Sequence, residues 1–168
     1  MGQVDFNKLW QNFLDTVTNH YFDTTGRIGR AQFWYFILVE VIIAIALAIV
    51  QSVLFSGLLT SIFGLAMLLP NVGMATRRMQ DIGRNGMLVW VAFIASGVMQ
   101  VITLLTILGS VAGALVFLAL FFTIGWIISL VALVAGIAVI YFCAQPGEVA
   151  ANAYGPPAPV WTPGPAAV

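Results

Sequence analysis

The stretch MLVWVAFIASGVMQVITLLTILGSVAGALVFLALFFTIGWIISLVALVAGIAVIYFCA, from Met87 to Ala144, decides the fold class. Its 58 residues contain no Asp, Glu, Lys or Arg. A helix needs about 20 apolar residues to cross a bilayer. Two spans with a turn between them fit this block well, whereas three would leave no room for turns. We place the turn at 108–113, which predicts spans near 88–107 and 113–142.

The composition of the whole chain agrees with a membrane protein. Of its 168 residues 61% are hydrophobic and only 7% are charged, and the mean hydropathy is +1.04. Soluble domains carry about 25% charged residues. The net charge is zero, so the sequence has no electrostatic footprint for nucleic acid. We therefore expect one all-α membrane domain over residues 31–144.

Two further spans are predicted before the long apolar block, near 31–55 and 57–76. The second contains Pro70, which removes a backbone donor and crowds the preceding turn. We expect this helix to kink or loosen at Pro70, with Asn71 and Gly73 either helping to satisfy the freed carbonyls or leaving a local opening. The total is four spans, and five remain an alternative.

The two ends of the chain differ from the apolar middle. Residues 4–21 place apolar side chains at helical spacing on one face and polar side chains on the other, so residues 1–30 are expected to hold an interfacial helix and a basic entry segment. Packing of that helix on a partner or on the protein's own loops is the alternative. Residues 145–168 hold six of the seven prolines, and we expect a flexible tail.

The basic residues predict the orientation. They form two clusters, one before the first span and one between the second and third spans: Lys8, Arg27 and Arg30, then Arg77, Arg78 and Arg84. Basic residues in short loops mark the cytoplasmic side, so both clusters and the N-terminus are predicted there. The tail is cytoplasmic with four spans and external with five.

The segment TRRMQDIGRNG, Thr76 to Gly86, carries three of the six basic residues. If the second helix runs to about residue 82, Asp81 can meet either Arg77 or Arg78 on one helical face. Gly83 suits a left-handed helix stop, and the Asn-Gly pair that follows suits a turn. We predict an ordered basic corner here, which can attract anionic lipid headgroups.

Glu40 is the one acid inside a predicted span. A carboxylate within a bilayer is costly and usually marks a site or a buried pair. It could be protonated, or Arg77 or Arg78 could reach it. The alternative is that Glu40 is shallow enough to reach the interface or to hydrogen-bond to a neighbouring helix.

Several motifs occur together in a fixed order: GRIGRAQFW, LLPNVGMATRRMQDIGRNG, CAQPG and NAYGPP. With them the chain resembles the YhaH-like family of small bacterial inner-membrane proteins, a domain-of-unknown-function family, over about residues 18–157. The resemblance implies an inner-membrane location and a fold of few helices, with no established activity. The characteristic positions that it carries over are Gly26, Arg27, Arg30, Phe33, Trp34, Pro70, Arg77, Arg78, Asp81, Gly83, Gly86, Pro146, Gly147, Asn152, Tyr154 and Gly155.

The chain departs from the family pattern at three positions. Gln32 stands where an acid is common, Gln80 where a histidine is common and Met87 where a tryptophan is common. Without that histidine, acid–base chemistry at the motif is not expected. One cysteine and one histidine also give no metal-ligand spacing. We therefore predict no enzyme, no catalytic residue, no cofactor and no metal.

The function that the sequence favours is an interaction module of the bacterial inner membrane. We expect anionic lipids as its partners in the bilayer, with a second copy or another membrane protein as the alternative partner. The predicted binding residues are Arg27, Arg30, Arg77, Arg78, Asp81 and Arg84. The rival function is a small-solute or ion transporter or channel subunit that uses Glu40 and the Pro70 helix break.

Overall fold

The computed structural model describes residues 5–54, 57–109 and 111–161, and the predictions for residues 1–4, 55–56 and 162–168 lie outside these ranges. Within these ranges all the assigned elements are helices, apart from an isolated β-bridge between Asn152 and Gly155. This confirms the predicted all-α class. The elements are α1 (Phe6–Thr18), α2 (Arg30–Leu54), α3 (Leu58–Asp81), α4 (Met87–Leu108), α5 (Val111–Leu120), the π-helix η1 (Phe121–Gly125) and α6 (Trp126–Ala144).

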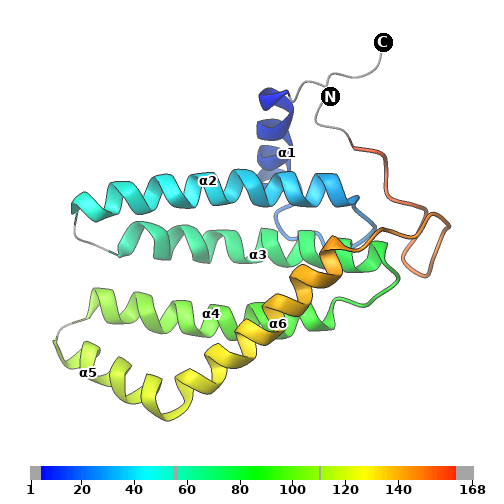
Figure 1. Cartoon of the computed structure of the whole chain (residues 1–168). Coiled ribbons are helices and arrows are strands. Elements are labelled where there is room, and N and C mark those ends of the chain that lie inside the picture. The colour runs from blue at the N-terminus through cyan, green and yellow to red at the C-terminus, as the bar shows by residue number, and fades with distance from the viewer. Residues whose placement is uncertain (1–4, 55–56, 110, 162–168) are drawn as a thin grey trace.

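Four helical segments are long and apolar enough to cross a membrane: Arg30–Val53, Leu58–Asp81, Met87–Leu108 and Leu118–Ala144. This is the architecture of a multi-pass membrane protein. Helices α2, α3 and α4 lie side by side, and α6 crosses them obliquely, packing on α4 and on α3 (Figure 1). The start of α2, the end of α3, the start of α4 and the end of α6 all meet at one end of the bundle.

We call this end the basic end and define it as residues 23–30, 76–86 and 141–161. The buried core also lies toward it, with Phe36, Met74 and Val89 fully enclosed. The opposite half of the bundle leaves many apolar side chains exposed, among them Ile49 and Leu105. Exposed apolar surface of this kind suits contact with lipid.

The last apolar block is bent instead of forming one long tilted span. Helix α5 runs away from the end of α4, and η1 then turns the chain into α6 (Figure 1). Within η1 the Thr123 hydroxyl donates to the carbonyls of Ala119 and Leu120, at 2.9 and 3.1 Å. π-Turns are a known cause of sharp helix bends, so the bend has a local origin.

Helix α3 continues through Pro70 as one helix, as a second span that runs past the proline requires. Pro70 cannot donate to the carbonyl of Ala66, four residues earlier. The hydroxyl of Tyr21 donates to that carbonyl instead, at 2.6 Å. Asn71 was expected to help, but its amide donates to Glu40. A side chain from the α1–α2 connection therefore satisfies the carbonyl that the proline frees.

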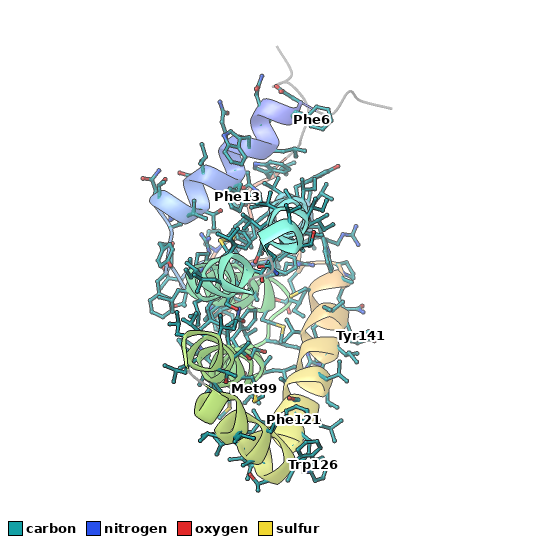
Figure 2. The ribbon with its side chains drawn as sticks, turned by 90° about the vertical axis from the view of Figure 1, so that its left-hand side faces the viewer. Phe6, Phe13, Met99, Phe121, Trp126 and Tyr141 are labelled. Carbon is teal, nitrogen blue, oxygen red and sulfur yellow. The ribbon has the colours of Figure 1, made fainter. Side chains whose placement is uncertain are left out.

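Helix α1 lies across α2 and α3, on the side of the bundle away from α6 (Figures 1 and 2). Its packed face combines Leu9 and Phe13 with Asn12 and Thr16, all buried. A neighbouring stripe of the helix, Phe6, Trp10 and Leu14, stays exposed. The apolar face predicted from the sequence is thus divided between the bundle and the surroundings.

Candidate functional site

Three charged side chains meet inside the basic end. Asp81, in the last turn of α3, accepts a hydrogen bond from Arg27 Nε through Oδ1 at 3.0 Å, and its Oδ2 accepts from Arg78 Nη1. The exposed fractions of the Arg27, Arg78 and Asp81 side chains are only 1%, 0% and 5%. Of the two pairs that the sequence allowed, the structure forms Arg78–Asp81. We call these three residues the clasp.

The clasp binds the backbone of the segment that follows α6. Arg27 Nη1 donates to the carbonyls of Ala150 and Gly155, at 2.8 and 3.3 Å, and its Nη2 donates to the carbonyl of Glu148. The amide of Glu148 donates to the Asp81 carbonyl at 2.9 Å. Residues 145–155 are therefore packed against the bundle through these hydrogen bonds.

The clasp residue Arg78 also donates to carbonyls at the C-terminal end of α6. The last four carbonyls of a helix have no partner within it. Here Arg78 Nε donates to Cys143 at 3.0 Å, and its Nη2 donates to Gln145 just beyond. Arg30 donates to Ala144 at 3.5 Å. The backbone amide of Gln145 donates to the Phe142 carbonyl, and its side-chain amide donates to the Tyr141 carbonyl. All four terminal carbonyls of α6 therefore have donors.

Glycines make room for this arrangement. A Cβ on Gly147 would collide with the Asp81 carboxylate, and one on Gly86 would lie 2.6 Å from Thr76 Cγ2. Gly83 has a φ of 72°, the left-handed conformation predicted for the end of α3. A side chain at Gly83 would also collide with the Glu148 carboxylate. The glycines of the motif thus allow the tail to approach α3 closely.

Arg77 points away from the clasp. Its Nη1 lies 3.6 Å from Asp23 Oδ2, in the connection between α1 and α2. Burial opposes ionisation of Asp23, but hydrogen bonds from Thr25 and the charge of Arg77 outweigh this, and the pKa of Asp23 is lowered from 3.8. Arg77 therefore fastens the connection to α3.

Arg30 and Arg84 are the two exposed arginines of the basic end. Both lie beside the C-terminal end of α6: Arg30 reaches Ala144, and the Arg84 guanidinium lies 4.1 Å from the centre of the Phe142 ring. Of the six predicted binding residues, the clasp residues and Arg77 are thus buried and paired within the protein, whereas Arg30 and Arg84 remain accessible.

Glu40 pairs with α3 and not with an arginine. Its Oε1 accepts a hydrogen bond from Asn71 Nδ2 at 2.7 Å. This is the alternative in which Glu40 bonds to a neighbouring helix, and the expected reach of Arg77 or Arg78 does not occur.

Several grooves lie between the helices, and two of them are lined in part by α6. An apolar groove of about 260 Å³ separates α2 from α6, and its lining includes Phe33, Trp34, Asn71, Gly136 and Ile140. A polar groove of about 390 Å³ lies among α3, α4 and α6, with the lining residues Ser61, Ser96, Met99, Gln100, Thr103, Ser129 and Ala132. The sequence predicts neither groove, because both depend on how the helices diverge.

A comparison with protein-family models identifies the family. The model described as "Protein of unknown function (DUF805)" matches residues 21–156. The chain belongs to the DUF805 family. This confirms the family resemblance of the motifs. No curated protein and no solved structure matches the chain. The DUF805 match begins at Tyr21 and ends one residue after Gly155, so it contains the whole clasp and the tail segment that the clasp holds.

Proposed function

We propose that this DUF805 protein is an interaction module of the bacterial inner membrane, without catalytic activity, whose cytoplasmic basic end binds anionic lipid headgroups. The support for the location is the charge asymmetry. Five of the six basic residues lie at one end of the bundle, and basic residues accumulate on the cytoplasmic side of membrane proteins. The N-terminus and the tail are then both cytoplasmic.

The observation that carries the lipid proposal is the exposure of Arg30 and Arg84. The buried arginines are occupied by carboxylates and backbone carbonyls, so they cannot reach an external anion. Arg30 and Arg84 are exposed residues, and both lie beside the C-terminal end of α6. Arginine binds phosphate groups well because its planar fork presents several donors.

Aromatic side chains near these arginines suit a headgroup position. Tyr141 belongs to the basic end, and Trp34 and Trp90 lie one helical turn from it. Helix α1 presents the exposed side chains of Phe6 and Trp10, of which Phe6 is labelled in Figure 2. Tryptophan and tyrosine concentrate at the membrane–water interface. In this proposal Arg30 and Arg84 lie among the headgroups, and Glu40 lies ten helical residues, about 15 Å, deeper than Arg30.

The test compares lipid retention by purified variants. The double variant Arg30→Gln, Arg84→Gln removes the two exposed charges, and the matched control Arg30→Lys, Arg84→Lys keeps them. We expect native mass spectrometry to show that the glutamine variant retains less phosphatidylglycerol, while the lysine variant stays close to the unchanged protein. Equal retention by both variants would refute the lipid proposal and favour a protein partner or a second copy.

The proposed orientation has a separate test. Val149 is 94% exposed in the tail segment. A Val149→Cys variant in a Cys143→Ala background should resist a membrane-impermeant thiol reagent in intact cells and react after lysis. Labelling in intact cells would place the tail outside and contradict the orientation.

A second candidate function is a small-solute or ion transporter or channel subunit. Two observations favour it. The Glu40–Asn71 pair lies next to the apolar groove, and the polar groove brings Gln100 and four hydroxyl side chains together between membrane-length helices. The experiment is solute or proton flux into vesicles that contain the protein, compared between the unchanged chain and the variants Glu40→Gln and Gln100→Leu. Unaltered flux in both variants would exclude this role for the two sites.

A further inference from the structure

The apolar groove between α2 and α6 lies directly below Arg30. Phe33, Trp34 and Ile37 follow Arg30 by three, four and seven residues, so they continue the same face of α2. On α6, Ile140 and Gly136 lie four and eight residues before Ala144, again on one face. The hydrogen bond from Arg30 to Ala144 joins the two helices at the top of the groove.

A cavity of different character lies on the other side of Arg30. It has about 430 Å³ and is lined by Gly29, Arg30, Ala31, Asp81 and tail residues 146–149 and 157–161. The first amides of α2 belong to this region, and helix N-termini favour anions. Two carboxylates also line it. Asp81 is bound by two arginines, and Glu148 accepts a hydrogen bond from Asn152 at 2.7 Å.

We infer that an anionic phospholipid binds here, with one acyl chain in the α2–α6 groove and its phosphate at Arg30. This rests on the proposed function and names the binding mode at one of its two arginines. The groove suits a chain because its lining is almost entirely hydrocarbon and aromatic. Charge complementarity also supports an anionic lipid, because Arg30 is an exposed cation at the end of the groove where the headgroup would lie.

A second copy of the protein fits this groove less well. The Arg30–Ala144 contact closes its top, and Trp161 of the tail packs at a tilt against Tyr35 of α2, with ring centres 5.5 Å apart. A flexible chain can enter from the side between α2 and α6, whereas a helix with its side chains is too wide for about 260 Å³.

Gly136 permits a specific test of the groove. A Cβ at this position has no heavy atom within 4 Å, so a larger side chain can enter the groove without displacing the protein. The test variant is Gly136→Phe, with Gly136→Leu as a smaller second filler. The matched control is Leu133→Phe, because Leu133 is 59% exposed on the same helix and does not line the groove. Thermal unfolding checks that each variant is folded.

The probes are dioleoyl phosphatidylglycerol, dioleoyl phosphatidylcholine and soluble glycerol phosphate, added to the full-length protein in detergent and followed by native mass spectrometry. We expect Gly136→Phe to weaken phosphatidylglycerol binding by about tenfold, since each methylene kept out of an apolar site lowers affinity about fourfold. Leu133→Phe should bind as the unchanged protein does. Phosphatidylcholine should bind more weakly than phosphatidylglycerol to the unchanged protein.

The outcomes separate this inference from the proposed function. If the glutamine variant of Arg30 and Arg84 loses phosphatidylglycerol while folded Gly136→Phe and Gly136→Leu retain it fully, the headgroup is bound without the groove and the inference fails alone. If neither set of variants changes binding, both fail. Competition by glycerol phosphate at the concentration of the lipid would also overturn the inference, because a free anion would then be the ligand.

Discussion

The hydrogen bond from Tyr21 to the Ala66 carbonyl allows a quantitative prediction. Tyr21→Phe removes only the hydroxyl, and the carbonyl that Pro70 leaves without its helical donor then loses its replacement. Hydrogen bonds in membrane proteins average about 0.6 kcal/mol and reach about 1.7 kcal/mol, and this one joins two exposed residues, Tyr21 and Ala66. We expect Tyr21→Phe to lower the free energy of unfolding by about 1 kcal/mol.

The reason can be tested with a double-mutant cycle. In a Pro70→Ala background residue 70 regains an N–H, which can donate to the Ala66 carbonyl as in an ordinary helix. Tyr21→Phe should then cost only a few tenths of a kcal/mol, which gives a coupling of about 0.5–1 kcal/mol between the two positions. The packing change caused by Pro70→Ala is common to both members of the pair and cancels.

The assay is reversible unfolding in mixed micelles with increasing dodecyl sulfate, followed by circular dichroism. Tyr35→Phe is the matched control, because it keeps the ring that packs at a tilt against Trp161 and should change stability by less than about 0.5 kcal/mol. Equal costs of Tyr21→Phe with and without Pro70 would refute the reasoning, because the hydroxyl would then stabilise something other than the freed carbonyl.

Three further predictions concern the basic end, each checked by unfolding in detergent. Gly147→Ala should lower the free energy of unfolding by about 1–3 kcal/mol, because the added Cβ collides with the Asp81 carboxylate. Gly136→Ala should leave the free energy of unfolding unchanged or raise it. Equal effects of the two substitutions would contradict the geometry. Asp81→Asn should cost about 3–5 kcal/mol because two buried arginines lose their shared anion, and Glu148→Gln should cost far less. Because the pKa of Asp23 is lowered in the folded protein, the contribution of Asp23 to stability is fully present above its ordinary pKa of 3.8 and is lost as the pH falls through the folded pKa. The difference in free energy of unfolding between the unchanged protein and Asp23→Asn should therefore shrink over that pH range. A difference that does not change with pH would exclude this contribution.

The sequence predicted the membrane architecture because that information is local. Twenty apolar residues identify a span wherever they occur, and the position of basic residues shows which ends lie together. The bend between α5 and α6 was not predicted, since it depends on a π-turn within a uniformly apolar segment. The way in which α3 accommodates Pro70 was not predicted, for another reason. Pro70 is visible in the sequence, but the hydroxyl that compensates for it belongs to Tyr21, 45 residues before the carbonyl that it serves.

The site was predicted only in part, for a similar reason. The Arg78–Asp81 pair follows from a spacing of three along one helix. The contacts of Arg27 with Ala150 and Gly155 span more than 120 residues and use backbone carbonyls, which every residue has. Gly147 is one sign in the sequence that the tail approaches α3 closely, but a single glycine after a helix is equally typical of an ordinary turn.

The arginines of the basic end divide into two groups, and the division changes what their substitution can test. Arg27 and Arg78 each bind several carbonyls as well as Asp81, so replacing them disturbs the tail and the end of α6 before any ligand is considered. Lysine would not replace them, since one ammonium cannot reproduce a planar fork of donors. Arg30 reaches one backbone carbonyl and Arg84 one aromatic ring, so their substitution disturbs this framework far less. A loss of lipid binding in variants of the first group would therefore report folding, and only variants of the second group can report recognition.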